Sequence, residues 1–420
     1  MSGVSTEALR DDPDFRRYLL ARAISVGGTL VSVVALPVLT YQLTGSAAWT
    51  SAVAATEALP YLLFGLFAGA FADRVNRRKL MVAADLLSAG LLASVPIAWA
   101  TGTLTAPHVL VVAFLTQTMF VLFDAANFGA LPALVGRERT TAAFSAVFGT
   151  TTVVEIAVPP LAALAVTMMT PAPLIALDAL TYAASALLIK AIAHPLSTSD
   201  RSRPRSASDI LVDVRGGLKF LWQNKIVRTL TLVGATHSAL GGAWIAMQLP
   251  WADRVLGIAP SGDARLAVLL SCWAVGGLIA SRLVPRLTRK FGAARLALLA
   301  LPTSLGAGLL VIATSHWLLA IVAITLWSTA FTTVVINGIT YRQQVTPDEL
   351  QGRVNTTARM LAWGVGHPVG AALAGAVAVW TDPRVGLASV VAILAVGVVA
   401  AWCSPLRTAA AERQLQSTAS

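Results

Sequence analysis

Five carboxyl groups lie inside long apolar stretches of the sequence, at Glu57, Asp85, Asp124, Glu155 and Asp178. A charge placed within a membrane costs about 2.5–3.5 kcal/mol on insertion scales, so such residues usually have a function. Removal from water raises the pKa of a carboxyl group toward the range in which it exchanges protons. We therefore expect proton exchange or ligand contact at Glu57 and Glu155, which fall near the middle of their stretches. A fixed hydrogen bond between helices is the alternative.

The other ionisable residues differ in depth and in sign. Asp85 and Asp124 lie nearer one end of their stretches, and Asp85 is a further candidate for proton coupling. The second half of the chain places His237, Arg359 and His367 within apolar stretches and no carboxylate well inside one. An imidazole titrates near neutral pH, so His237 is also a proton-coupling candidate, the alternative being a hydrogen-bonded core residue.

Other polar and aromatic side chains are candidates for lining a ligand cavity. For the two arginines in this set the alternative is a side chain that extends to the membrane surface. Any of the aromatic residues can instead pack between helices. The predicted cavity residues are Arg22, Asn127, Asp178, Trp244, Asn337, Arg359 and Trp363.

The segments that position these residues are long enough to cross a bilayer, which takes about 20 apolar residues. Mean hydropathy is +0.73 and only 12% of the 420 residues are charged. We predict an all-α membrane protein with twelve transmembrane helices. They span residues 17–43, 48–72, 79–101, 107–131, 141–167, 172–193, 226–256, 264–284, 294–314, 317–341, 352–379 and 384–404.

Basic residues fall in alternate gaps between these segments. Of the 31 Lys and Arg residues, only Arg254, Arg265 and Arg384 lie at the ends of segments that border the gaps that we assign to the outside. Short loops rich in Lys and Arg stay on the cytoplasmic side of a membrane. We therefore predict a multi-pass protein of the cell inner membrane with both termini in the cytoplasm.

The same distribution argues against other classes of protein. The net charge of +11 is scattered over short loops, which argues against a nucleic-acid-binding face. The two cysteines, Cys272 and Cys403, form no disulfide framework or metal site, and we expect no cofactor. The sequence lacks the clustered metal ligands that an intramembrane enzyme would need. It also lacks the large polar domain that a sensor or scaffold would need.

Two internal similarities predict a duplicated bundle. The segment Gly69–Arg74 resembles Gly277–Arg282, and Val158–Ala165 resembles His367–Ala374 at nearly the same offset. We expect two pseudo-symmetric six-helix bundles over residues 1–193 and 226–420. Residues 194–225 between them form a cytoplasmic linker with a short surface helix around Leu211–Trp222.

The loop between the second and third segments carries the sharpest motif, which begins at Gly69 and continues through Asp73, Arg74, Arg77 and Arg78. Glycine on a helix face lets a neighbouring backbone approach, and an aspartate at a membrane boundary needs a partner. An ordinary positive-inside loop accounts for the arginines but not for the spacing of Gly69 and Asp73.

This loop resembles the signature of the major facilitator superfamily, with Asn76 where that pattern prefers glycine. Asn tolerates the left-handed conformation that a tight turn needs. The resemblance implies two six-helix bundles, a latch at Asp73 toward the eleventh helix, and a pair between Arg77 and Asp124. The motifs Gln42–Ser46, Leu131–Pro132, Pro347–Arg353 and Gly366-x-Pro368-x-Gly370 resemble the branch of enterobactin exporters and macrolide or multidrug efflux proteins.

The resemblance implies a secondary exporter of a small hydrophobic or amphipathic compound, such as a drug, antibiotic or secondary metabolite, driven by proton antiport with alternating access. Siderophore export and, less favoured, uptake are the alternatives. Val158-Pro159-Pro160 replaces the glycine-rich antiporter motif of the fifth helix, which leaves the coupling scheme open. We expect the partners to be a small-molecule substrate, protons and membrane lipid, with no nucleic acid, and the protein to be a monomer.

Overall fold

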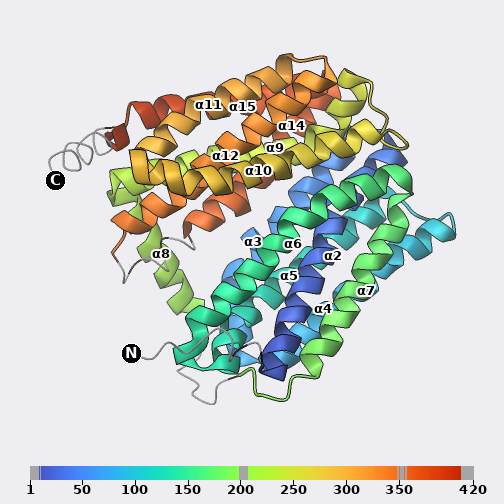
Figure 1. Ribbon diagram of the computed structural model, residues 1–420, viewed down its shortest axis with the longest axis vertical. Coiled ribbons are helices and arrows are strands. Elements are labelled where there is room, and N and C mark those ends of the chain that lie inside the picture. The colour runs from blue at the N-terminus through green and yellow to red at the C-terminus, as the bar shows by residue number, and fades with distance from the viewer. Residues whose placement is uncertain are drawn as a thin grey trace. The chain divides into compact units, whose positions relative to one another are not determined.

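The computed structural model describes residue 9, residues 11–197 and 207–347, residues 350 and 354, and residues 357–407. Within these ranges the chain is helical, as predicted, and its long helices run through two compact units (Figure 1). The first unit comprises Met1–Leu43 and Pro60–Ile210, and the second comprises Thr44–Leu59 and Leu211–Ser420. The division at residues 193 and 226 stays a prediction.

The first unit contains α2 (Pro13–Thr44), α4 (Arg77–Ala100), α5 (Ala106–Val135), α6 (Thr140–Met168) and α7 (Pro171–Lys190). It also contains the part of α3 (Ala47–Arg74) that follows Leu59. The helix α4 packs against both α5 and α7. Apolar side chains from α2, α4, α5 and α7 form one core at one end of these helices, with Phe15, Met81, Phe123 and Ile189 at its centre.

The second unit contains α8 (Ala207–Gln223), α9 (Lys225–Leu256), α10 (Ala264–Phe291), α11 (Ala293–Ala313), α12 (Trp317–Val345), η2 (Met360–Gly366), α14 (His367–Trp380) and α15 (Pro383–Trp402). The helix α9 contacts α12, η2, α14 and α15, so it is the central element of this unit. The predicted linker helix is confirmed as α8, although its place on a membrane surface stays a prediction.

Helix ends follow from the local sequence. Asn76, Asn224, Asp263 and Asp382 each accept a backbone N–H of the following first turn, which satisfies a donor that the helix leaves unpaired. Gly257 ends α9 at φ +63°, a left-handed conformation that glycine adopts without steric cost.

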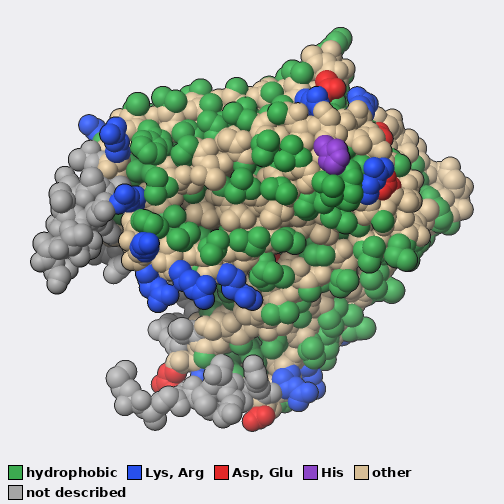
Figure 2. Space-filling model, turned by 45° about the horizontal axis from the view of Figure 1, so that its top comes forward, with side chains coloured by type: hydrophobic (Ala, Val, Ile, Leu, Met, Phe, Trp, Pro, Cys, Tyr) green, Lys and Arg blue, Asp and Glu red, His purple; other side chains and the backbone are tan. Residues whose placement is uncertain are grey.

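The helices are long and apolar enough to support the twelve-span prediction. Eleven in the described ranges could cross a membrane by length and composition, and α3 adds a further apolar helix of 28 residues. Large apolar side chains such as Phe148 and Val396 are 74% and 71% exposed, as expected of a surface that faces lipid. Figure 2 shows hydrophobic side chains spread over the visible face, with Lys and Arg side chains clustered in a few groups.

Glycine permits the closest helix packing in the second unit. A Cβ at Gly370 of α14 would overlap the carbonyl oxygen of Ala239 in α9, and one at Gly242 would overlap the carbonyl oxygen of His367. Small residues allow backbones to approach in this way in membrane proteins. The start of α3 belongs to this unit too, since a Cβ at Gly375 would overlap the hydroxyl of Ser51.

Candidate functional site

The signature loop joins α3 to α4 through a helix cap. Asn76 has φ −68° and ψ 112°, and its side chain accepts the Lys79 N–H at 3.1 Å. Asn76 therefore makes no use of the left-handed conformation that Asn tolerates, because its side chain serves as an N-cap in extended backbone.

The arginines of the loop bind carbonyl oxygens of neighbouring helix ends. Arg77 Nη1 donates to the Gly129 carbonyl at 3.2 Å, and Arg78 Nη2 donates to the His194 carbonyl at 2.6 Å. A Cβ at Gly129 would lie 2.5 Å from Arg77 Cζ, so glycine makes room for the guanidinium. Arg74 is exposed at the end of α3. These contacts tie the loop to the ends of α5 and α7.

Three expectations about this loop have different outcomes. The side chain of Asp73 lies outside the described residues, so its latch stays a prediction. A Cβ at Gly69 would meet no described atom within 4 Å, so the close approach expected there does not occur among these residues. Asp124 accepts a hydrogen bond from Tyr61 at 3.0 Å, and its pairing with Arg77 stays a prediction.

Arg22 of α2 lies within the polar interior of the first unit. Its guanidinium stands 5.3 Å from the centre of the Phe123 ring and is close enough to Asp85 and Glu155 for their charges to interact. Asp85 is only 1% exposed. On the same face, Tyr18 donates a hydrogen bond to Asn127. Arg22 therefore lies within electrostatic reach of two carboxyl groups of its own unit, and its predicted place in the ligand cavity stays a prediction.

The remaining carboxyl groups have contrasting surroundings. Asp178 is buried between α2 and α7, where Ser32 donates to it at 2.5 Å and Thr181 at 3.0 Å. Glu155 is exposed on α6, and Glu57 is half-buried on α3 with no hydrogen bond or ion pair among the described residues. Asp178 is thus held by hydrogen bonds, whereas the roles of Glu57 and Glu155 stay predictions.

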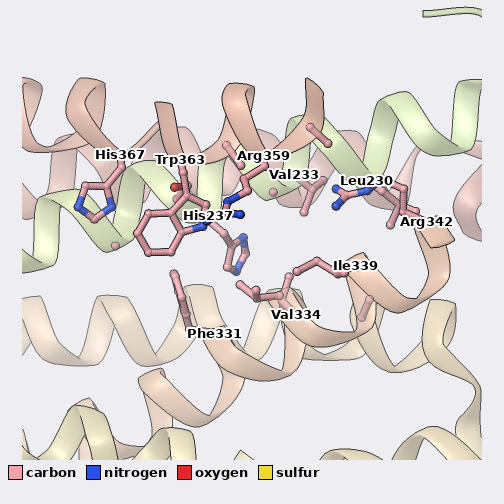
Figure 3. A pocket seen from close by; sticks show the side chains of 18 of the residues that line it. Leu230, Val233, His237, Phe331, Val334, Ile339, Arg342, Arg359, Trp363 and His367 are labelled. Atoms are coloured by element: carbon pink, nitrogen blue, oxygen red, sulfur yellow. The ribbon is translucent and has the colours of Figure 1, made fainter. Parts of the chain in front are cut away.

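The second unit contains a pocket of about 480 Å³ lined by α9, α12 and the segment that leads into α14 (Figure 3). Drug-sized ligands occupy pockets of about 300–1,000 Å³. Figure 3 shows His237 of α9, Phe331 of α12, and Arg359 and Trp363 of the segment that leads into α14 projecting into the same space. The lining is mainly apolar, with a few polar groups between the aromatic rings.

Aromatic rings form a continuous cluster behind and along this pocket. Trp273 lies 5.2 Å from Phe331 and 5.9 Å from Trp244, measured between ring centroids. Phe331 lies 5.6 Å from His237. On the other side of the pocket, Trp363 stacks on His367 with centroids 5.4 Å apart and planes 8° apart. Flat rings therefore bound the pocket on more than one side.

A π-helical stretch places Trp363 in this pocket. Residues Met360–Gly366 form the π-helix η2, seven residues long, directly before α14. Such stretches are rare and occur often at functional sites, because the wider turn changes the direction of the side chains. Trp363 is 58% exposed while its neighbour Gly364 is buried.

The pocket divides the predicted residues into two groups. His237, Arg359 and Trp363 line it. Trp244 and Asn337 do not, since Trp244 is buried behind Trp273 and Asn337 is buried in a hydrogen bond from Thr288 at 2.8 Å. Neither residue lines this pocket, and the prediction that they line the transport cavity stays a prediction.

Sequence reasoning missed Arg342, Gln343 and Phe331 as lining residues. Arg342 follows the predicted end of its span and was counted among the loop cations, although it is only 9% exposed. The one sequence feature that could have indicated Arg342 is its position directly after the predicted end of the span at residue 341. The helix α12 in fact continues to Val345. No group of three or more His, Cys, Asp or Glu side chains that could hold a metal occurs among the described residues.

Comparison with known proteins agrees with this architecture. A family model described as Major Facilitator Superfamily matches residues 18–366. The multidrug efflux pump Tap of Mycobacterium tuberculosis is 33% identical over 236 residues, which are 53% of this chain and 54% of that protein. The matched region thus spans about half the length of that relative. Tap of Mycolicibacterium fortuitum is 28% identical over 376 residues, covering 86% of this chain and 88% of that protein.

Solved structures share the fold at low sequence identity. The nucleoside transporter NupG superposes with a TM-score of 0.73 at 14% identity, covering 93% of this chain and 97% of NupG. A bacterial homologue of the human lysosomal transporter Spinster gives 0.73 at 12% identity, with 96% and 97% covered. A bacterial homologue of the iron transporter ferroportin gives 0.71 at 14%, with 92% and 97% covered.

Proposed function

The chain belongs to the major facilitator superfamily, and from this premise we propose that it exports a small hydrophobic or amphipathic compound, such as a drug, by proton antiport. The observation that carries the proposal is similarity to a multidrug efflux pump over 86% of the chain. The pocket supports it, since an aromatic lining with few polar groups suits a mainly apolar ligand.

Alternating access is the mechanism that we propose for this transport. Two six-helix halves that move about a ligand site near the middle of the membrane expose that site to each side in turn. Membership of this family supports a transporter rather than an enzyme. The alternating motion is reversible and does not set the direction of transport. The proposal of export therefore rests on the efflux relatives.

Proton coupling is assigned to Glu57 and Glu155. Glu57 has no hydrogen bond or ion pair within the described ranges, and Glu155 is exposed near the Arg22 charge, so neither is committed to a fixed structural bond. A carboxyl group in this setting can take up a proton on one side of the membrane and release it on the other. Asp85 and His237 are the secondary candidates.

Export is tested in a bacterial host that lacks its main drug exporters. Cells that express the chain should accumulate less of a fluorescent amphipathic dye than cells with an empty vector, and collapse of the proton gradient should remove the difference. If cells that express the chain and cells with an empty vector accumulate the same amount of every dye in a panel of neutral, anionic and cationic dyes, export is contradicted. Higher accumulation that depends on the gradient would favour uptake.

The coupling residues are tested with matched amide variants. Glu57→Gln combined with Glu155→Gln should abolish the dependence of export on pH, because an amide cannot exchange a proton at these positions. Glu138→Gln removes an exposed carboxylate from a loop and is the control. Export that keeps its full pH dependence in the double variant would show that coupling lies elsewhere.

A further inference from the structure

The charged side chains that line the pocket of the second unit all have the same sign. Arg342 and Arg359 line it together with His237 and His367, and no described Asp or Glu is among the lining residues. An organic cation in this pocket would be repelled by two guanidinium groups at short range, whereas an anion would be attracted. The sign of the charge therefore distinguishes between ligand classes.

The two arginines can bind an anion directly. Figure 3 shows Arg342 reaching in from α12 and Arg359 from the turn before η2. A guanidinium carries five N–H donors in a planar fork that matches a carboxylate, so it can bind a ligand while it keeps other partners. Arg342 is 9% exposed, and its low exposure strengthens the electrostatic attraction for a ligand.

His237 adds a polar group whose hydrogen-bonding capacity the fold does not fill. Its side chain is fully buried, and among the described residues only the Val233 carbonyl, one turn earlier on α9, comes near enough to accept from its ring. One carbonyl can accept from only one of the two ring nitrogens. The other nitrogen is therefore expected to pair with a water molecule or a ligand hydroxyl.

The rest of the lining recognises a flat apolar body. Trp363 is 58% exposed and lines the pocket, and Phe331 stands across from it (Figure 3), with its ring 5.2 Å from that of Trp273, which also lines the pocket. Aromatic ligands gain from stacked and edge-on contacts with such rings. Aromatic faces also attract cations, but at this site the two arginines oppose that attraction.

We propose that this pocket binds an amphipathic organic anion, with a carboxylate held between Arg342 and Arg359 and a flat aromatic body between Trp363 and Phe331. The proposal rests on the proposed transport function, because it names the class of substrate. It differs from that function in committing to a charge, and so it can fail while export stands.

Binding is measured on the full-length chain in lipid nanodiscs with three probes that share one ring system. These probes are 2-naphthoate, the neutral 2-naphthylmethanol and the cationic 2-naphthylmethylammonium. The readout is quenching of tryptophan fluorescence or direct calorimetry, neither of which requires transport. The anion should bind at least tenfold tighter than the cation.

Matched arginine variants locate the site. Arg359→Gln or Arg342→Gln should weaken 2-naphthoate binding about tenfold or more, because each removes a charge-assisted hydrogen bond. Neither change should alter binding of 2-naphthylmethanol by more than about twofold. Arg286→Gln, at an exposed arginine of α10 that does not line the pocket, should change nothing.

The outcomes separate this inference from the proposed function. A cation that binds tighter than the anion, or Arg359→Gln and Arg342→Gln proteins that are folded and keep full affinity for 2-naphthoate, would overturn the anion site. If dye export is observed together with either of these results, the proposed export function is retained and only the anion site is rejected. Selective binding of 2-naphthoate with no export of any dye would reject the exporter and retain the site.

Discussion

Trp363 stacks on His367 across one turn at the junction of η2 and α14, with 5.4 Å between ring centroids and 8° between ring planes. His367 is 4% exposed and its carbonyl faces the Gly242 backbone, so the imidazole is fixed by the packing of α9 against α14. Trp363 is fixed on one face by this stack and leaves its other face open to the pocket. The pocket wall is therefore built before any ligand binds.

Trp363→Ala should weaken binding of an aromatic ligand with little loss of stability. The side chain is 58% exposed, so truncation removes ligand contact and leaves no large internal cavity. Loss of one stacked ring should cost about 0.5–1.5 kcal/mol beyond the lost apolar area. Titration with 2-naphthoate and thermal unfolding of the same sample measure the two effects. Trp380→Ala, at an exposed residue outside the pocket, is the control, and equal effects from both changes would contradict this role.

Gly370→Ala should destabilise the second unit. The new methyl group would overlap the Ala239 carbonyl oxygen, which belongs to rigid backbone and cannot move aside cheaply. Overpacking of this kind costs about 1–3 kcal/mol. Gly306→Ala on α11 meets no described atom within 4 Å and should be neutral. The measurement is thermal unfolding in detergent, and similar midpoints for the two variants would show that α9 and α14 do not require glycine here.

Asp178→Asn should leave transport and its pH dependence unchanged. Ser32 donates to one carboxyl oxygen and Thr181 to the other, so an amide keeps one of these bonds with its oxygen, and its NH2 group can donate to the second hydroxyl once that hydroxyl rotates. Asp178→Leu should instead lower stability, because it leaves both hydroxyl groups without this acceptor. Dye export across a pH series measures the first effect. A loss of pH dependence in Asp178→Asn would move proton coupling to this residue.

The sequence predicted the fold well because its evidence is repeated along the whole chain. Apolar length and the alternation of basic loops are averaged over many residues, so they indicated the spans even where α2 and α12 extend past the predicted ends. Single positions were harder. Nothing in Met360–Gly366 distinguishes a π-helix from an α-helix, and this difference decides where Trp363 points.

The sequence also did not indicate which polar and aromatic side chains are buried between helices. Asn337 and Trp244 have the residue types expected of a cavity, but Asn337 binds Thr288 and Trp244 packs among Trp251, Trp273 and Trp327. Which face of a helix meets a neighbour depends on tertiary packing, which a nearly uniform apolar sequence does not reveal. His237 and Arg359, which line the pocket, stand out in the sequence because ionisable residues are rare within apolar spans, and their coupling and ligand roles stay predictions.

Topology is testable with single cysteines in a variant that lacks Cys272 and Cys403. Thr103→Cys lies in an exposed loop assigned to the outside, and His194→Cys lies in one assigned to the cytoplasm. A membrane-impermeant maleimide added to intact spheroplasts should label the cysteine at 103 and not the one at 194. Inverted vesicles should show the opposite pattern. Labelling of position 194 from outside the cell would reverse the predicted orientation.

Uptake into inverted membrane vesicles tests the central claim most directly. Vesicles that contain the chain, acidified inside, should accumulate a dye or drug against its gradient. Addition of a protonophore should release it, and vesicles that carry Glu57→Gln with Glu155→Gln should not respond to the pH gradient. Accumulation that is unaffected by collapse of the pH gradient, or that never exceeds that of vesicles without the chain, would contradict proton-driven export.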